Sequence, residues 1–196
     1  SKAIRTRFPC SERDLEQSLR ALAADAENPP KAYVQEVIFP KELAFLTGKY
    51  VDVDEINYLA KRMRHFTQEE ADKLYAIAES TGYNQLKDLI DFTFNIDRYM
   101  LVQEIGDVET LGKEYYSYTG CSAPSLQDCA EKGWELLGSN EGKFTHKGLL
   151  FPLKWIEYKP MYDGEAFPYD CDRNDVLLEV DVHYRWKTGY VYLPAE

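Results

Sequence analysis

The feature that most constrains the fold is a pair of helix-start signals in the middle of the chain. Asp52-x-x-Glu55 and Thr67-x-x-Glu70 both resemble capping boxes, in which the first side chain accepts hydrogen bonds from the free N–H groups of the first turn. Apolar residues at helical spacing follow each signal. Gly82 suits the left-handed end of the second helix, and Asn84 is the expected start of a third. Three short helices predict an acidic helical unit over residues 52–110.

The segment before this unit combines strand and helix patterns. Residues 2–9 alternate apolar and basic side chains, which predicts a half-exposed strand. Residues 11–25 carry leucines at helical spacing behind Ser11, a suitable N-cap. Residues 31–39 alternate again and predict a second strand. We therefore expect an N-terminal β-α-β unit over residues 1–51.

The last part, residues 111–196, has a mixed pattern. Helices are expected over 107–118 and 125–137, and strands over 148–151, 155–158, 176–184 and 190–193. Lys187-Thr188-Gly189 resembles a hairpin turn, which would place Val180, Val182 and Tyr184 opposite Tyr190 and Tyr192. The whole chain therefore predicts an α+β fold with antiparallel β-hairpins near its C-terminus.

The charge balance limits the kinds of partner. The 196 residues hold 34 acidic and 23 basic side chains, a net charge of −11. Residues 52–110 hold 13 acids against 6 bases, whereas residues 1–51 hold 7 against 8. Nucleic acids and anionic membranes bind clustered Lys and Arg, so we expect neither as a direct partner. No apolar run approaches the ~20 residues that span a bilayer, and no signal-peptide pattern is present, so we expect a cytoplasmic protein.

The sequence lacks the motifs of the common catalytic and cofactor sites. Its three histidines and four cysteines form no metal-ligand spacing, no C-x-x-C pair and no nucleophile signature. Its glycines form no phosphate-binding loop. A pairing of Cys171 with His146 or His183 stays open. We expect no catalytic residues, no metal and no cofactor.

One stretch offers an alternative reading as an enzyme. Residues 157–172 combine aromatic side chains with acids, as a carbohydrate-active enzyme would need for sugar stacking and acid–base work. The acids are Glu157, Asp163, Glu165, Asp170 and Asp172. A surface loop with solvated acids explains the same residues, and we favour it.

The acids of the middle unit are the main candidates for binding a partner. They are Asp52, Asp54, Glu55, Glu69, Glu70, Asp72, Glu79, Asp88 and Asp91. Neighbours three or four residues apart on a helix are ~5–6 Å apart, so their carboxylates can imitate the row of phosphates on a DNA strand. Acids near helix N-termini also stabilise the helix dipole without any partner.

Several blocks of the chain resemble ArdA-type antirestriction proteins of Firmicutes mobile elements. They are VDVDEINYLAKRM at 51–63 with Phe66, LKDLIDFTFN at 86–95, GLLF at 148–151, YDG at 162–164 with FP at 167–168, and YVYLP at 190–194. The resemblance spans nearly the whole chain in the same order.

The resemblance implies a non-catalytic DNA mimic that occupies the DNA groove of a type I restriction–modification enzyme. Members of the family are elongated acidic dimers, so we expect a homodimer. Plentiful aromatics and a C-terminal hairpin with a free edge favour association as well. A different host nuclease is the alternative target; CRISPR effectors also have basic DNA channels.

Overall fold

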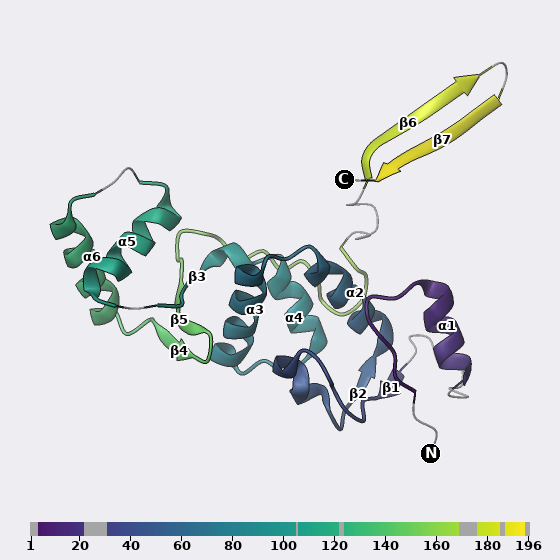
Figure 1. Cartoon of the computed structure of the whole chain (residues 1–196), viewed down its shortest axis with the longest axis horizontal. Coiled ribbons are helices and arrows are strands. Elements are labelled where there is room, and N and C mark those ends of the chain that lie inside the picture. Colours follow the sequence, from purple (N-terminus) through teal and green to yellow (C-terminus); the bar gives the residue numbers. More distant parts are fainter. Residues whose placement is uncertain are drawn as a thin grey trace.

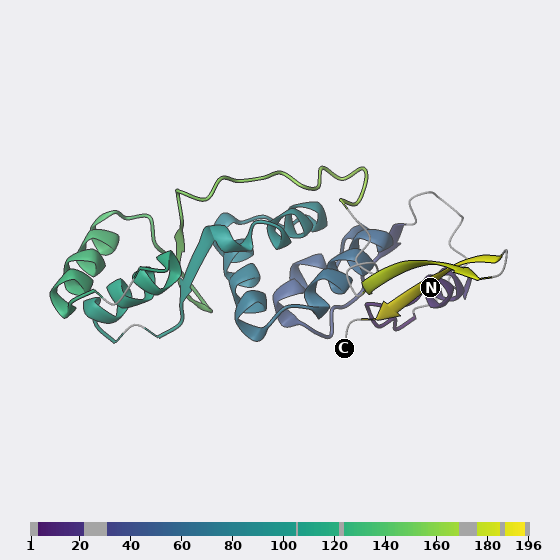
Figure 2. The same cartoon turned by 90° about the horizontal axis from the view of Figure 1, so that it is seen from above.

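The computed structural model describes residues 4–21, 31–104, 106–121, 124–168, 176–184 and 187–194. The chain combines helices with small antiparallel sheets, which confirms the α+β class. Figures 1 and 2 show an elongated body, with α5 and α6 at one end and α1 at the other. The helices are α1 (Glu12–Ala21), η1 (Lys41–Leu46), α2 (Val53–Arg64), α3 (Gln68–Thr81), α4 (Leu86–Thr93), η2 (Ile96–Arg98), α5 (Val108–Thr119) and α6 (Leu126–Gly138).

The strands form three small antiparallel sheets in the described part of the chain. One pairs β1 (Lys31–Tyr33) with β2 (Tyr50–Asp52), and another pairs β6 (Val176–Tyr184) with β7 (Lys187–Pro194). The third has the order β3-β5-β4, with β3 (Tyr99–Val102), β5 (Gly148–Pro152) and β4 (Lys143–Thr145).

The N-terminal segment differs from the expected β-α-β unit. Residues 4–10 form no strand, so the first predicted strand is wrong. The side chain of Asn57 holds this segment instead: its Oδ1 accepts from the Cys10 N–H at 2.9 Å, and its Nδ2 donates to the Cys10 carbonyl at 3.1 Å. Alternation along a segment predicts a strand only when another strand is there to pair with it. The second predicted strand ends early, at Tyr33.

The capping signals of the central helices are confirmed. Asp52 accepts hydrogen bonds from the N–H groups of Asp54 and Glu55 at the start of α2. Thr67 and Glu70 form a reciprocal capping box on α3, and Gly82 ends that helix in the left-handed region at φ 69°. The predicted start of α4 is wrong, because its N-cap is Gln85, without a side-chain hydrogen bond.

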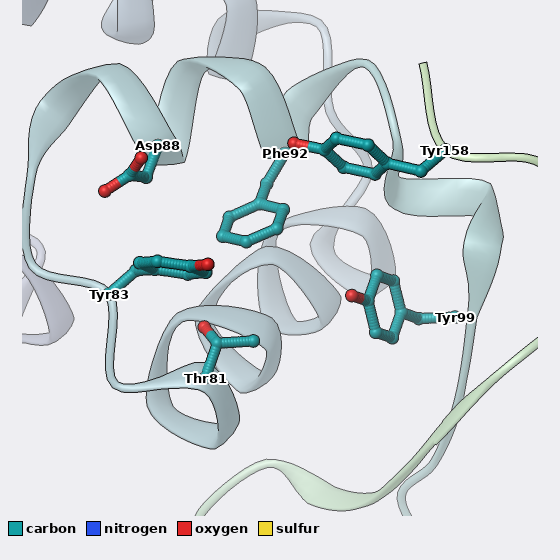
Figure 3. A pocket seen from close by; sticks show the side chains of 6 residues that line it. All are labelled: Thr81, Tyr83, Asp88, Phe92, Tyr99 and Tyr158. Carbon is teal, nitrogen blue, oxygen red and sulfur yellow. The ribbon is translucent and has the colours of Figure 1, made fainter. Parts of the chain in front are cut away.

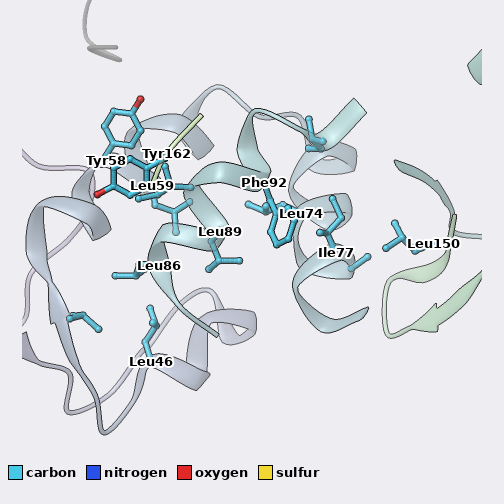
Figure 4. Packing of buried hydrophobic residues seen from close by; sticks show 14 of the residues in the cluster. Leu46, Tyr58, Leu59, Leu74, Ile77, Leu86, Leu89, Phe92, Leu150 and Tyr162 are labelled. Carbon is cyan, nitrogen blue, oxygen red and sulfur yellow. The ribbon is translucent and has the colours of Figure 1, made fainter. Parts of the chain in front are cut away.

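The main hydrophobic core lies where α2, α3 and α4 meet. Leu74, Ile77, Leu89 and Ile90 are fully buried there. Figure 4 shows these helices packing around it, with Leu150 reaching the core from β5. Leu46, Leu101 and Tyr162 belong to the same cluster, so it takes residues from all three expected segments. The division into units 1–51, 52–110 and 111–196 stays a prediction.

Two glycines allow α5 and α6 to pack closely. A Cβ atom on Gly112 would lie 1.8 Å from the Cys129 carbonyl oxygen, and one on Gly133 would lie 2.0 Å from that of Val108. Both helices match the predicted ranges closely. A smaller apolar cluster around Met100, which includes Leu111 of α5, joins this end to β3 and β5.

The C-terminal strands confirm some predictions and correct others. β5 and β6 lie where they were expected, but residues 155–158 form no strand. Lys187-Thr188-Gly189 is not the turn, because these residues pair with Tyr184, His183 and Val182. The connection at 185–186 lies outside the described residues. In the observed register Val180 pairs with Val191 instead of a tyrosine.

Candidate partner-binding surface

The nine candidate acids divide into two groups in space. Glu55 of α2 and Asp91 of α4 hydrogen-bond to the extended segment that follows β5. Glu69 and Glu79 of α3 instead contact α5 and the β4–β5 turn. We call residues 153–168 the strap. Figure 2 shows it running along the body from β5 past the central helices toward α2.

Three polar residues of the α4–η2 segment bind the strap, and the two segments run in opposite directions. Arg98 Nε donates to the carbonyl of Ile156 at 2.8 Å. Three residues earlier, the Asn95 amide makes two hydrogen bonds with the backbone of Lys159, at 2.8 and 2.9 Å. Residues three or four positions apart in the α4–η2 segment therefore contact residues three positions apart in the strap.

Asp91 completes this row and is a structural residue. Its carboxylate accepts from the N–H of Tyr162 at 3.0 Å, from the N–H of Met161 and from the hydroxyl of Tyr158. Asp91 is only 5% exposed. Buried carboxylates need such donors, since an unpaired buried charge is very costly. Asp91 was expected on a partner-binding face, but its buried carboxylate is not accessible to a partner.

The end of the strap packs on α2. The Tyr162 hydroxyl donates to Glu55 Oε1 at 3.1 Å. The Phe167 ring stacks on Tyr58 at a centroid distance of 4.3 Å and on Tyr162 at 5.2 Å. Stacked pairs of this kind contribute about 0.5–1.5 kcal/mol each beyond their burial. The tertiary fold thus brings the strap and the first turn of α2 together.

This contact gathers acids from three separate segments. We call Asp52, Asp54, Glu55, Asp88 and Asp163 the carboxylate cluster. Burial raises the pKa of Glu55, and the charges of Asp52 and Asp88 raise it further, against the Tyr162 hydrogen bond, which lowers it. Burial and Asp52 raise the pKa of Asp54.

Two further pKa shifts describe the same cluster. Burial raises the pKa of Asp88, with a further increase from Asp91 and a decrease from Lys87. Burial, Glu55, Asp52 and Asp163 together raise the pKa of Tyr162. The cluster therefore holds mutually repelling charges, with Lys87 as the nearby cation that lowers the pKa of Glu55 and Asp88.

The acids of α3 are engaged within the protein. Glu70 belongs to the capping box, and Glu69 accepts from the Tyr118 hydroxyl at 2.8 Å. Glu79 contacts His146, both at the backbone N–H and at Nδ1. Glu69 and Glu79 are exposed, and each joins α3 to a neighbouring element. These contacts within the protein explain the presence of both acids without a binding partner.

Asp72 is buried, at 8% exposure, and forms a polar network. Lys147 Nζ lies 2.9 Å from its carboxylate and 2.8 Å from that of Glu42. Gln68 and Gln103 also donate to Asp72. The hydrogen bond from Lys147 lowers the pKa of Glu42, and both carboxylates raise the pKa of Lys147. Asp72 was also expected to present its charge to a partner, but its carboxylate is buried and bound within the protein.

The stretch proposed for a carbohydrate-active enzyme serves mainly as the strap. Its residues 157–168 are described, whereas Asp170 and Asp172 lie outside the described residues. Tyr162 is buried, and Phe167 packs on two rings, so these aromatics are occupied. Asp163 accepts from the Glu165 N–H in a local turn. The packing favours the structural interpretation over a sugar-binding one.

The His, Cys, Asp and Glu side chains of the described residues form no metal-binding arrangement, because no group of three or more of them could hold a metal ion. Cys10, Cys121 and Cys129 are free thiols. A pairing that involves Cys171 lies outside the described residues.

Sequence reasoning missed the residues that fasten the strap. Asn95, Arg98 and Tyr162 were not singled out, nor was Lys147, which pairs with Asp72. One signal was available: Asp91 near the end of α4 and Asn95 just after it are polar residues in a mostly apolar stretch, and buried polar groups need partners. The sequence could not show that those partners lie 64 to 71 residues later.

Comparison of the chain with models of protein families, with curated proteins and with solved structures finds no match. None of the described helices is both long and apolar enough to cross a membrane.

Proposed function

We propose that the protein is a non-catalytic, cytoplasmic inhibitor of a host DNA-targeting nuclease, which it binds by imitating DNA. The observation that carries this proposal is the carboxylate cluster. Its members come from the start of α2 with its N-cap Asp52, from α4 and from the strap. Burial first, and then the charges of neighbouring acids, raise the pKa of Asp54, Glu55 and Asp88. Ionised carboxylates under such repulsion are relieved by an incoming cation. Basic side chains in a DNA groove would supply it.

The shape and overall charge support the same proposal. The body is long and narrow (Figures 1 and 2), as a substitute for a duplex segment would be. A net charge of −11 would raise the rate of encounter with a basic groove. The surface we assign to the partner is smaller than the sequence alone suggested, because Asp72 and Asp91 are buried.

The target that the sequence resemblance favours is a type I restriction–modification enzyme. A CRISPR effector nuclease is the second candidate, since its channel also binds a nucleic-acid backbone through basic side chains. Both belong to one mechanism, in which the inhibitor and the duplex compete for one groove.

The test is a DNA-binding competition with purified enzymes of both kinds. Asp54→Asn, Glu55→Gln and Asp88→Asn are combined in one variant. A matched control removes three charges from α5 and α6 through Glu109→Gln, Glu114→Gln and Glu131→Gln. We expect the cluster variant to lose inhibition by roughly 10-fold or more, because close interfacial charge pairs couple strongly.

Inhibition should also be competitive with duplex DNA and should weaken as salt rises, since exposed charges are screened over ~8 Å at physiological ionic strength. Two results contradict the proposal. One is an inhibited complex that still binds DNA. The other is a control variant that loses as much inhibition as the cluster variant.

A further inference from the structure

A pocket of about 290 Å³ lies beside the carboxylate cluster. It is lined by Thr81, Tyr83, Asp88, Phe92, Tyr99 and Tyr158, which come from α3, the α3–α4 connection, α4, β3 and the strap (Figure 3). The volume lies near the lower limit of the roughly 300–1,000 Å³ found for small-molecule sites. The pocket therefore suits a single side chain better than a large ligand.

The lining combines aromatic rings with one carboxylate. Asp88 and Phe92 are four residues apart on α4, so both face the same side of that helix. The Tyr83 ring lies 5.4 Å from that of Phe92 and is half exposed. Figure 3 shows the hydroxyl groups of Tyr83 and Tyr99 facing each other across the space. No basic side chain is among the described residues that line it.

Rings and a carboxylate around one space match the chemistry of a bound cation. The face of an aromatic ring attracts cations, and an adjacent carboxylate adds a hydrogen-bonding counter-charge. A guanidinium group suits this pocket better than an ammonium group, because it is planar, stacks on rings and is less strongly hydrated. The Arg98 guanidinium already lies 5.1 Å from the Tyr158 ring centre, and its charge also acts on Tyr99, so the half-exposed Tyr83 ring is the one most open to an incoming group.

We infer that this pocket receives an arginine side chain of the partner, beside the carboxylate cluster. The inference rests on the proposed function for the identity of the partner, but the recognition of a guanidinium group does not. Asp88 belongs to both the pocket and the cluster, so one docking event would satisfy both. Burial is the main cause of the raised pKa of Asp88, and the charge of Lys87 acts in the opposite direction.

The direct test uses NMR on the isolated chain of 196 residues with ring-labelled tyrosines. The probe is N-acetyl-arginine N-methylamide, and N-acetyl-norleucine N-methylamide is its uncharged control. We expect saturable shifts in the millimolar range at Tyr83, Tyr99 and Tyr158, a weak affinity as befits one side chain. Tyr33 and Tyr50, exposed on the β1–β2 pair, serve as internal controls. Asp88→Asn should weaken the arginine response at least roughly threefold.

Each outcome decides the inference. Shifts confined to the pocket tyrosines, specific to arginine and weakened in Asp88→Asn, support it. Equal shifts with norleucine or with the corresponding lysine derivative overturn the choice of a guanidinium group, and the absence of saturable shifts overturns the site. If no nuclease is inhibited while the arginine titration succeeds, the proposed function fails and guanidinium binding remains.

A second measurement connects the pocket to inhibition. Tyr83→Leu removes the exposed ring without touching the strap, and Tyr33→Leu is its matched control on the β1–β2 pair. Once a nuclease target is in hand, we expect Tyr83→Leu to weaken inhibition several-fold more than Tyr33→Leu. Equal inhibition by both variants would contradict the inference that an arginine of the partner occupies this pocket.

Discussion

Asn95 and Lys159 are joined by two hydrogen bonds between the Asn95 side-chain amide and the Lys159 backbone, at 2.8 and 2.9 Å. Asn95 is 3% exposed, so both bonds lie away from water. The pair fixes the alignment of the strap with the α4–η2 segment. This alignment determines which strap residues reach α2. The position of Asp163 in the carboxylate cluster depends on it.

We predict that Asn95→Ala and Asp91→Ala each destabilise the fold by about 2–4 kcal/mol. Each substitution leaves several buried donors or acceptors of the strap without a partner, at about 1–3 kcal/mol per group. Urea unfolding measures the loss of stability, and hydrogen exchange should show faster exchange at Lys159 or Tyr162. Asp97→Ala, at an exposed position next to this segment, should change stability by less than about 0.5 kcal/mol. Equal effects of Asp97→Ala and Asp91→Ala would contradict the anchoring role.

Lys147→Met should destabilise the protein by about 1–3 kcal/mol, because it leaves the buried Asp72 carboxylate without its cation. Lys143→Met, four residues earlier at an exposed position on β4, is the control. Thermal unfolding followed by circular dichroism provides the comparison. Adding Asp72→Asn to Lys147→Met should recover part of the loss, since the unpaired charge is then gone. A double variant that is less stable by the full sum of both single losses would argue against a coupled pair.

The pH dependence of stability should reveal the carboxylate cluster. Asp54, Glu55 and Asp88 have raised pKa values in the folded protein. Their contribution to stability is therefore fully present below the ordinary values of 3.8 for Asp and 4.5 for Glu, and it is lost as pH rises through the folded values.

The variant with Asp54→Asn, Glu55→Gln and Asp88→Asn does not lose this contribution. We expect it to gain stability relative to the unchanged protein between acidic pH and pH 7, by up to about 1 kcal/mol. Urea unfolding at several pH values measures this gain. A variant whose relative stability falls over the same interval would show that the three charges are favourable in the free protein.

We predict a homodimer, and α6 offers a surface for it. Leu126, Trp134 and Leu137 are exposed by 79%, 65% and 40%, and their spacing sets them on one side of the helix. Light scattering at tens of micromolar, roughly the range in which a modest interface persists, should give twice the monomer mass. Trp134→Gln should shift it toward monomer, whereas Phe144→Gln, exposed on β4, should not. A strict monomer at that concentration contradicts the prediction.

The start of α3 illustrates what local sequence can predict, because the Thr67–Glu70 box is complete within three residues. The C-terminal hairpin shows the limit. Gly189 favoured a turn at 187–189, yet Gly189 pairs with Val182 inside the hairpin. The strand expected over 155–158 is absent as well. The Arg98 side chain donates a hydrogen bond to the Ile156 carbonyl, so a side chain takes the position that a neighbouring strand would have.

The sequence by itself determined the helices of the central unit, the caps of α2 and α3 and the acidic charge, because these depend on residues within a few positions of one another. Only the tertiary structure decided which acids are available. Asp91 and Asp88 stand one helical turn apart with the same side-chain chemistry, and one is buried under the strap while the other lines an open pocket. That difference arises from donors about 70 residues away along the chain, and distant contacts of this kind leave no local pattern.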